Sequence, residues 1–379
     1  MKLSIFLPTY NGASLLEDCL ESILSQDGDF QLVVSDNASS DRTPEILAAR
    51  SGDERLKVIT QPETIGVTDN WLAAMAACDG DYLLMMGDDD YLLPGAVTRL
   101  IALLEEYGNP DCLTFQGYGF AFPDALEPGS PIYYSDPLFP FHESVPERGE
   151  LPSELRREIV RSFFRFEFKF CPNLQTTLVS QRAFSRMRHG VLREPYPDFY
   201  AIHALMLLVD RWVRVPDKLM LVGISPKSFG RTLKQGGSEE GRAYLQIETA
   251  FDGALPGSDM VNGWHRTLQN LREDYAPELR EIDISRSNYV YRQGYNWYLA
   301  YRMGWIDRRE LGRRLRLLSG SDYLGFAREL LSRFNLDMLR RHAKVDDDSA
   351  IASVWPNMRP APEVPSAPAM AERLAGRAS

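Results

Sequence analysis

The sequence has few of the residues that build zinc sites, disulfide frameworks or membrane spans. It contains four cysteines, and no two of them are close enough in sequence to form a Cys-x-x-Cys pair. This scarcity excludes a zinc ribbon and a dithiol redox motif, and it is typical of small buried thiols in a reducing compartment. The longest apolar stretch, near residues 199–209, is much shorter than the roughly 20 residues that a membrane span needs.

The N-terminal segment also lacks a targeting signal. Its apolar run carries a single lysine and is broken at Pro8, so it is too short for a signal peptide. We therefore expect a cytoplasmic protein with no transmembrane span. Peripheral contact with the inner face of the membrane stays open.

Positive charge is scarce in the first 100 residues, which hold 6 Lys or Arg against 17 Asp or Glu. This balance excludes a nucleic-acid groove in that part of the chain, because phosphate backbones bind basic surfaces. An acidic region suits a divalent cation, which can in turn hold a phosphate. Residues 301–344 have the opposite balance, with 11 Lys or Arg against 5 Asp or Glu.

Short apolar runs alternate with helical patterns over the first 120 residues. We expect strands at 3–7, 31–35, 56–60 and 81–86, each followed by a helix. The first helix follows a Ser-x-x-Glu capping box at Ser14, and the second begins at Thr43 with Thr43 as its N-cap. This alternation predicts an α/β, Rossmann-like fold with a mostly parallel sheet and flanking helices.

Acidic residues follow two of these expected strands. Asp36 comes directly after the second strand, and Asp88, Asp89 and Asp90 come after the fourth. Ligands of such sheets bind at the carboxyl ends of the strands. We therefore expect both acidic segments to face one crevice.

The three adjacent aspartates favour a divalent cation, because neighbouring carboxylates repel one another unless positive charge neutralises them. Oxygen ligands of this kind suit Mg²⁺ or Mn²⁺. A solvated acidic turn is the alternative. Asp36 is equally consistent with a contact to a ribose or base and with a local turn. Thr9 and Tyr10 could line a base pocket, but taken alone their segment favours a simple turn.

Taken together, four segments resemble the family 2 glycosyltransferases, which have the GT-A fold and act by inversion. The resemblance is specific over residues 1–110, weaker to about residue 235 and absent beyond. In chain order the segments read PTYN at 8–11, VSDNASSD at 34–41, GDY at 80–82 and DDDYLLP at 88–94.

The resemblance implies a role for each matching residue. Asp36 corresponds to the aspartate that contacts the base of the donor, with Pro8, Thr9 and Tyr10 beside it. The acidic triplet corresponds to the DxD motif, which holds the metal and the ribose. Many members have an aspartate where this chain has Gly87. One register therefore puts the metal on Asp89 and the ribose on Asp88, and the other uses Asp88 and Asp90.

An inverting transfer needs a general base for the acceptor hydroxyl. The family places an acidic residue about a hundred residues after the DxD motif, and this region contains Asp198 and Glu194. We expect Asp198 to be the base and Glu194 to be the alternative, although a helix N-cap also fits Asp198. Further on, Lys227 or Arg231 is a candidate for stabilising the diphosphate, with a charged loop as the alternative.

The remaining sequence predicts helices. We expect a GT-A-like domain over residues 1–235, a helical domain over 236–345 and a disordered, proline-containing tail over 346–379. His203 is expected to be a core residue. The aromatic run at 289–305 favours helix packing over a sugar-stacking role, and the arginines from Arg308 to Arg316 fit either a solvated face or a contact with anionic lipid.

We therefore predict a metal-dependent, inverting glycosyltransferase that uses a nucleotide-diphosphate sugar, with a UDP-sugar favoured. The acceptor is a glycan, a lipid-linked molecule or a protein, as in polysaccharide or glycoconjugate synthesis. A non-catalytic nucleotide- or sugar-binding protein on the same fold is the main alternative. A sugar nucleotidyltransferase is less consistent, because the loop after the first strand has only Gly12 and no nearby lysine or arginine.

Overall fold

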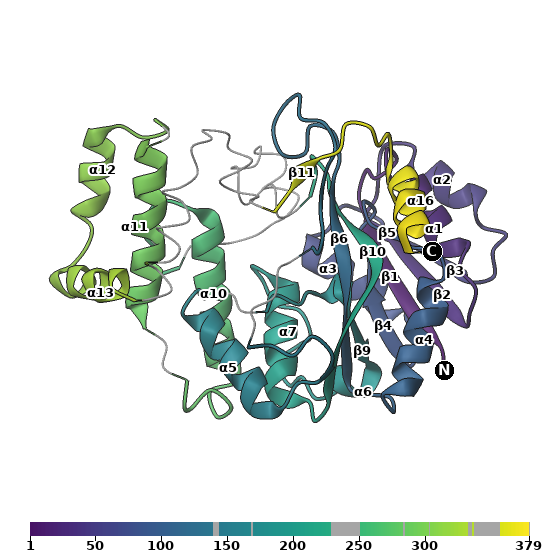
Figure 1. Ribbon diagram of the computed structural model, residues 1–379, viewed down its shortest axis with the longest axis horizontal. Helices are drawn as coiled ribbons and strands as arrows, with labels where there is room; N and C mark the ends of the chain where they lie inside the picture. The colour runs from purple at the N-terminus through teal and green to yellow at the C-terminus, as the bar shows by residue number, and fades with distance from the viewer. Residues whose placement is uncertain are drawn as a thin grey trace.

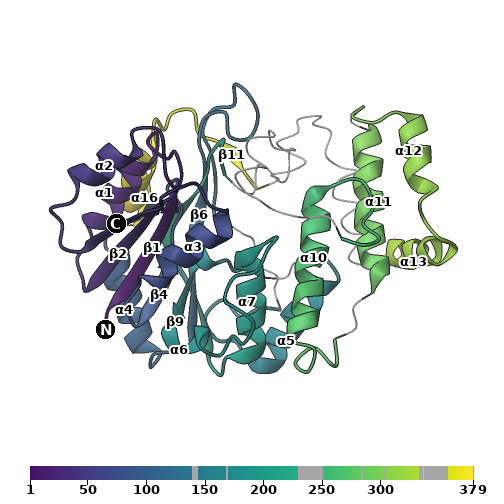
Figure 2. The same ribbon diagram turned by 180° about the vertical axis from the view of Figure 1, so that it is seen from behind.

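The computed structural model describes residues 1–138, 144–167, 170–228, 251–282, 285–302, 304–332, 336 and 357–378. Figure 1 shows a body built around a twisted sheet at one end of the molecule. Helices formed by residues 259–330 lie at the other end, whereas the helix formed by residues 367–378 lies beside the sheet. The view from behind in Figure 2 shows the same arrangement.

The central feature of the body is a mixed sheet. Its main path has the order β11-β7-β6-β9-β4-β1-β2-β3, and β10 pairs with β5, β6 and β8. In the described residues the strands are β1 (Leu3–Thr9), β2 (Phe30–Asp36), β3 (Leu56–Thr60), β4 (Tyr82–Met85), β5 (Tyr91–Leu92), β6 (Cys112–Ala121), β7 (Tyr133–Ser135), β8 (Gly149–Glu150), β9 (Thr177–Ser180), β10 (Trp212–Ile224) and β11 (Arg359–Pro360).

The first four strands run parallel to one another, and β10 runs parallel to β6. Strand β9 lies between β4 and β6 and is antiparallel to both. This is the mixed, mostly parallel α/β sheet that the sequence predicts.

Helices cover the sheet and form the second part of the molecule. In the described residues they are α1 (Leu16–Leu24), α2 (Thr43–Ala49), α3 (Val67–Ala76), α4 (Ala96–Glu106), α5 (Ser153–Phe164), the 3₁₀ turn η1 (Leu174–Thr176), α6 (Gln181–Phe184), α7 (Pro197–Leu208), α10 (Asp259–Asp274), α11 (Arg286–Arg302), α12 (Arg308–Leu315), α13 (Gly320–Leu330) and α16 (Ala367–Ala378). None of these helices combines the length and the apolar character that crossing a bilayer requires.

The two faces of the sheet are packed separately because side chains of a strand alternate between faces. Ile5 and Leu7 of β1 join a core with α1, α2 and α4. Phe6 of the same strand joins a second core with α3, α5 and α7, which continues into α10 and α11. Burial on both faces explains why β1 and β4 are mostly apolar, whereas the edge strand β3 is largely exposed.

Two predicted helix starts differ in detail from the structure. Helix α1 begins after Leu15, which makes no side-chain cap, so the predicted capping box at Ser14 is wrong. Helix α2 begins at Thr43 with Arg42 as its N-cap residue. The helices themselves lie where the apolar periodicity predicts them.

The structure contradicts the predicted disorder of the tail for its described part, residues 357–378. Strand β11 pairs antiparallel with β7, and α16 follows it. Ala367, Met370 and Leu374 have helical spacing and are buried against Phe120 and Leu221. This apolar face outweighs the composition of the segment, whose prolines lie before the helix or in its first turn. Residues 346–356 of the predicted tail, and the predicted domain boundary near residue 235, lie outside the described residues.

We expect Met370→Ala to lower the free energy of unfolding by about 2 kcal/mol, the lower end for truncating a buried methionine. Met370 is 2% exposed between α16 and the sheet. Urea unfolding followed by circular dichroism measures the effect. The matched control is Leu324→Ala, because Leu324 is 76% exposed and its truncation should change stability by no more than about 0.5 kcal/mol. Equal stability of the two variants would contradict the packing of α16.

Candidate functional site

Three chain segments meet at the carboxyl edge of the sheet. Strand β1 ends at Thr9, and its register pairs Thr9 with Asp36, the last residue of β2. The hydroxyl of Thr9 donates a hydrogen bond of 2.6 Å to Oδ2 of Asp88, which follows β4. The structure therefore brings both predicted acidic segments into one site.

The loops after β1 and β2 are joined by side-chain hydrogen bonds. Oδ1 of Asn11 accepts from the backbone N–H of Ser40 at 2.8 Å, and Oδ2 of Asp41 accepts from that of Ala13 at 3.1 Å. Asp36 is 1% exposed, and its Oδ1 accepts from the N–H of Ser39 at 3.1 Å. Pro8 and Tyr10, two further predicted site residues, are half-buried in this region.

Asp88, Asp89 and Asp90 form the acidic turn after β4, and Asp90 is its buried anchor. Its Oδ2 accepts hydrogen bonds from the N–H of Gly87 at 2.7 Å and from the amide of Gln175 at 2.8 Å. Its Oδ1 accepts from the N–H of Gly223 at 2.9 Å. Burial, followed by the charge of Asp89, raises the pKa of Asp90 to about 8, while these donors act in the opposite direction.

Asp88 and Asp89 are less buried than Asp90 and have fewer protein donors. Asp88 accepts from Thr9, and Oδ2 of Asp89 accepts from the hydroxyl of Ser228 at 2.6 Å. Burial, followed by the charge of Asp89, raises the pKa of Asp88 to about 7, and Thr9 and Lys227 oppose this rise. Such a carboxylate gains most from an added positive charge.

The segment after β10 passes over this acidic turn. Gly223 lies so close to the backbone of Asp89 that a Cβ atom there would collide with the Asp89 carbonyl oxygen. The ammonium of Lys227 donates to the carbonyl oxygen of Asn11, and its charge acts on the carboxylates of Asp41 and Asp88. Lys227 therefore lies close to the loops after β1 and β2 and to the acidic turn. Arg231, the other predicted phosphate-binding residue, lies outside the described residues.

Asp198 lies in the first turn of α7, directly after Pro197. Burial raises its pKa to about 6, against the lowering effect of nearby backbone N–H groups. The loop that precedes it reaches the start of α3, because Glu194 lies beside Thr68 and Asp69. Helix α3 follows β3 and so begins at the carboxyl edge of the sheet. This places the loop of Asp198 at the edge that holds Asp36 and Asp88.

His203, by contrast, is a core residue, as the sequence predicts. It is 1% exposed, its Nδ1 lies 2.6 Å from the carbonyl oxygen of Phe199, and its ring packs edge-on against Phe163. Burial lowers its pKa to about 4. Within the described ranges, no three His, Cys, Asp or Glu side chains converge as a set of metal ligands.

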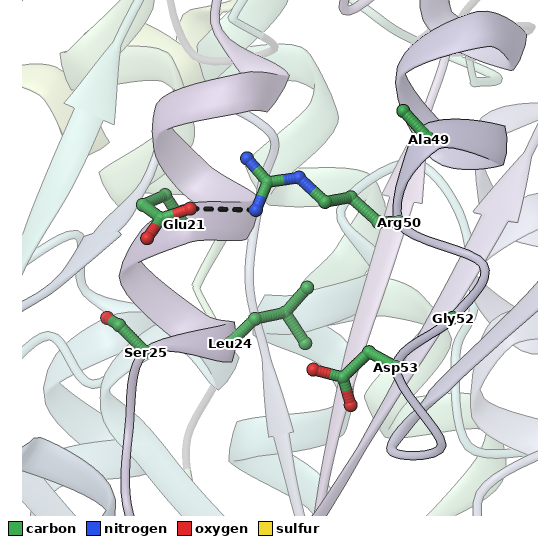
Figure 3. A pocket seen from close by; sticks show the side chains of 7 residues that line it. All are labelled: Glu21, Leu24, Ser25, Ala49, Arg50, Gly52 and Asp53. Atoms are coloured by element: carbon green, nitrogen blue, oxygen red, sulfur yellow. Dashed lines mark hydrogen bonds and ion pairs between the residues drawn. The ribbon is translucent and has the colours of Figure 1, made fainter.

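A surface pocket on the body lies away from this site. It is placed between the C-terminal ends of α1 and α2, and Glu21 and Arg50 form an ion pair of 2.8 Å across it (Figure 3). These helices run antiparallel to the strands, so their C-terminal ends lie at the amino edge of the sheet. The pocket is therefore not part of the candidate site.

Sequence reasoning missed three residues that shape the site. Gln175 holds Asp90, Ser228 holds Asp89, and Gly223 allows the backbone of β10 to approach the acidic turn. Gly223 and Ser228 lie within four positions of Lys227 in the sequence, and this proximity to a predicted site residue is a local signal that could have identified them. Gln175 carries no local signal, because its contact joins residues 85 positions apart.

A comparison with known families agrees with this geometry. The model described as glycosyl transferase family 2 matches residues 4–142, which include Thr9, Asp36 and the whole acidic turn. Asp198 and Lys227 lie beyond the matched residues.

Two curated relatives each match more than a quarter of the chain. The GalNAc(5)-diNAcBac-PP-undecaprenol beta-1,3-glucosyltransferase of Campylobacter jejuni is 34% identical over 108 residues, covering 28% of this chain and 35% of the relative. The abequosyltransferase RfbV of Salmonella typhimurium is 32% identical over 114 residues, covering 29% of this chain and 34% of the relative. The chain thus spans about a third of the length of these relatives.

The solved structure of S. aureus TarS is similar over a longer range. It superposes with a TM-score of 0.50 at 16% sequence identity, covering 91% of this chain and 54% of TarS. At this identity the similarity bears on the fold alone. It agrees with a GT-A-like α/β sheet followed by C-terminal helices.

We expect Asp90→Ala to lower the free energy of unfolding by about 3 kcal/mol, because it leaves one buried and two partly buried N–H groups without their acceptor. Asp89→Ala is the matched control within the same turn. It removes one hydroxyl contact and one repelling charge, so we expect a change within about 1 kcal/mol. Urea unfolding without divalent cations measures both, and equal losses would show that Asp90 is not the anchor.

Proposed function

Because the chain belongs to glycosyl transferase family 2, we propose that it transfers a sugar from a nucleotide-diphosphate donor to an acceptor hydroxyl, with inversion at the anomeric carbon. The observation that carries this proposal is the meeting of Asp36, Thr9 and Asp88 at the carboxyl edge of the sheet. A donor needs a base-contacting residue and a phosphate-binding region at one site. These residues supply both.

The nucleotide lies along the ends of β1 and β2 in this proposal. Asp36 accepts from an N–H of the base, with Pro8, Thr9 and Tyr10 beside it, and a UDP-sugar is the favoured donor. Asp88 accepts a hydrogen bond from Thr9 of this segment, which supports a role for Asp88 in binding the ribose or the metal.

Asp88 and Asp89 are the residues that would hold a divalent cation, Mg²⁺ or Mn²⁺. Their carboxylate oxygens are suitable hard donors, and such cations are commonly held by one or two carboxylates together with substrate phosphates. Asp90 already accepts three N–H bonds, so we assign it to positioning the turn rather than to the cation. When bound, the cation supplies positive charge that stabilises the departing nucleotide diphosphate.

Asp198 is the proposed general base. Its carboxylate takes the proton of the acceptor hydroxyl as the oxygen attacks the anomeric carbon from the side opposite the diphosphate. The bond between that carbon and the diphosphate oxygen breaks, and its electron pair leaves with the nucleotide. Lys227 holds positive charge over the same edge, where it stabilises the leaving group.

The acceptor belongs to glycoconjugate or polysaccharide synthesis in this proposal. The Campylobacter jejuni relative is named for a glycan carried on an undecaprenyl diphosphate, which supports a lipid-linked acceptor. A glycan or a protein remains an alternative acceptor. Because the match covers only 35% of that relative, the proposal names a chemical class of acceptor and not one substrate.

The test is nucleotide release from a set of nucleotide sugars with Mn²⁺ or Mg²⁺ present. We expect Asp198→Asn to lower turnover by about 10²- to 10⁴-fold, the usual contribution of a positioned general base. The donor affinity measured by calorimetry should stay unchanged. Asp259→Asn is the matched control, because Asp259 also lies in the first turn of a helix. Chelation of the cation should remove activity and readdition should restore it.

Two outcomes would contradict this proposal. Equal turnover of wild type and Asp198→Asn would remove Asp198 as the base. Donor binding without turnover in wild type, across the acceptors tested, would instead support a non-catalytic binding protein.

The pH dependence of kcat/KM provides a separate measurement of the base. The pKa of Asp198 is raised to about 6, so its carboxylate form is lost as the pH falls through that value. We expect kcat/KM to be level above this pH and to fall about tenfold per pH unit below it, at saturating metal. A profile whose acid limb lies near pH 4 would mean that another carboxylate is the base.

A further inference from the structure

Large exposed apolar side chains are concentrated in one part of the described chain. Ten such residues are exposed, and nine of them lie between residues 298 and 331. The other one is Val58 in β3, which is 39% exposed. Because soluble surfaces rarely gather apolar side chains in this way, the concentration indicates an interaction surface.

Helix α13 turns apolar side chains away from the rest of the molecule. Phe326 packs against Tyr291 of α11, and Glu329 accepts a hydrogen bond from Ser287, so these two residues mark the inner face. Leu324 and Leu331 lie about half a turn away from that face and are 76% and 74% exposed. The outer face of α13 is therefore apolar.

Helix α12 and its flanking turns add positive charge and further apolar side chains. Leu311 packs inward, which places Arg309 and Arg313 on the opposite, exposed side of the helix. Trp305 before the helix is 66% exposed, and Leu317 after it is 54% exposed. Figures 1 and 2 both show α12 and α13 at the end of the molecule that is remote from the sheet.

We call this region the outer helical surface, defined by Trp305, Arg309, Arg313, Leu317, Leu324 and Leu331. Residues 298–332 contain seven arginines and four carboxylates. All four carboxylates have partners in the protein: Asp307 accepts from the N–H of Glu310, Glu310 pairs with Arg313 and Arg314, Asp322 pairs with Arg286, and Glu329 accepts from Ser287. The charge that this region presents to a partner is therefore positive.

We propose that the outer helical surface docks the protein on an anionic lipid bilayer. Tryptophan and leucine side chains enter the boundary between headgroups and acyl chains, while arginines bind the anionic headgroups. A second copy of this chain would bring arginine opposite arginine, which like-charge repulsion disfavours. This inference does not depend on the proposed reaction, because none of these residues belongs to the candidate active site.

The test is flotation of the full chain with vesicles of phosphatidylcholine alone and of phosphatidylcholine mixed with phosphatidylglycerol. We expect binding to the mixed vesicles only, weakened by added salt. The double variant Arg309→Gln and Arg313→Gln should bind about thirtyfold more weakly, because each basic residue near an anionic surface contributes about fivefold. Trp305→Ser with Leu324→Ser should lose about tenfold or more, through loss of apolar insertion.

Matched controls separate this surface from general effects. Val58→Ser removes an exposed apolar side chain elsewhere, and Arg280→Gln removes an exposed arginine in the turn after α10. Both should bind like wild type, and all variants should release nucleotide at the wild-type rate with a soluble acceptor. Failure to bind mixed vesicles, or equal losses in the controls, would overturn the inference. A change in oligomeric state of the double variants, measured by light scattering, would assign the surface to a second copy instead.

Discussion

The hydrogen bond between Thr9 and Asp88 is the interaction on which the site depends. It joins the end of β1 to the turn after β4, and the register of β1 with β2 then places Asp36 beside both. Gly12 lies so close to the Asp88 carboxylate and the Thr9 hydroxyl that a Cβ atom there would collide with them. Close packing of this kind fixes the carboxylate before any ligand arrives, which lowers the cost of ordering it on binding.

Holding three neighbouring carboxylates in one turn requires compensation, because their charges repel one another. The three carboxylates have different surroundings in the structure. Asp90 is satisfied by donors from Gly87, Gln175 and Gly223, so it anchors the turn from inside, while Asp88 and Asp89 are left toward the crevice. This division favours the register in which Asp88 binds the ribose and Asp89 binds the metal. The sequence alone is equally consistent with the register that uses Asp88 and Asp90.

Much of the fold could be predicted because its signals are local. The apolar runs at β1 to β4 and the helical periodicity between them specify a parallel sheet, and the carboxyl-edge rule then places Asp36 near Asp88. The rest depends on pairing between distant segments. Strand β10 passes Asp89 because it pairs with β5 and with β6, and Gln175 reaches Asp90 from η1. The prediction of disorder is wrong for residues 357–378, because the helical spacing of Ala367, Met370 and Leu374 outweighs the composition of the segment.

The uneven distribution of charge along the chain also follows from this architecture. The acidic first hundred residues belong to the sheet body, and the arginines of α12 lie at the other end of the molecule (Figure 1). Salt screens exposed charges over about 8 Å at physiological ionic strength, so the two regions act independently. A cation at the acidic turn is therefore not opposed by the arginines, and an anionic partner at the helices is not repelled by the aspartates. A chain that mixed these charges over one surface would weaken both kinds of contact.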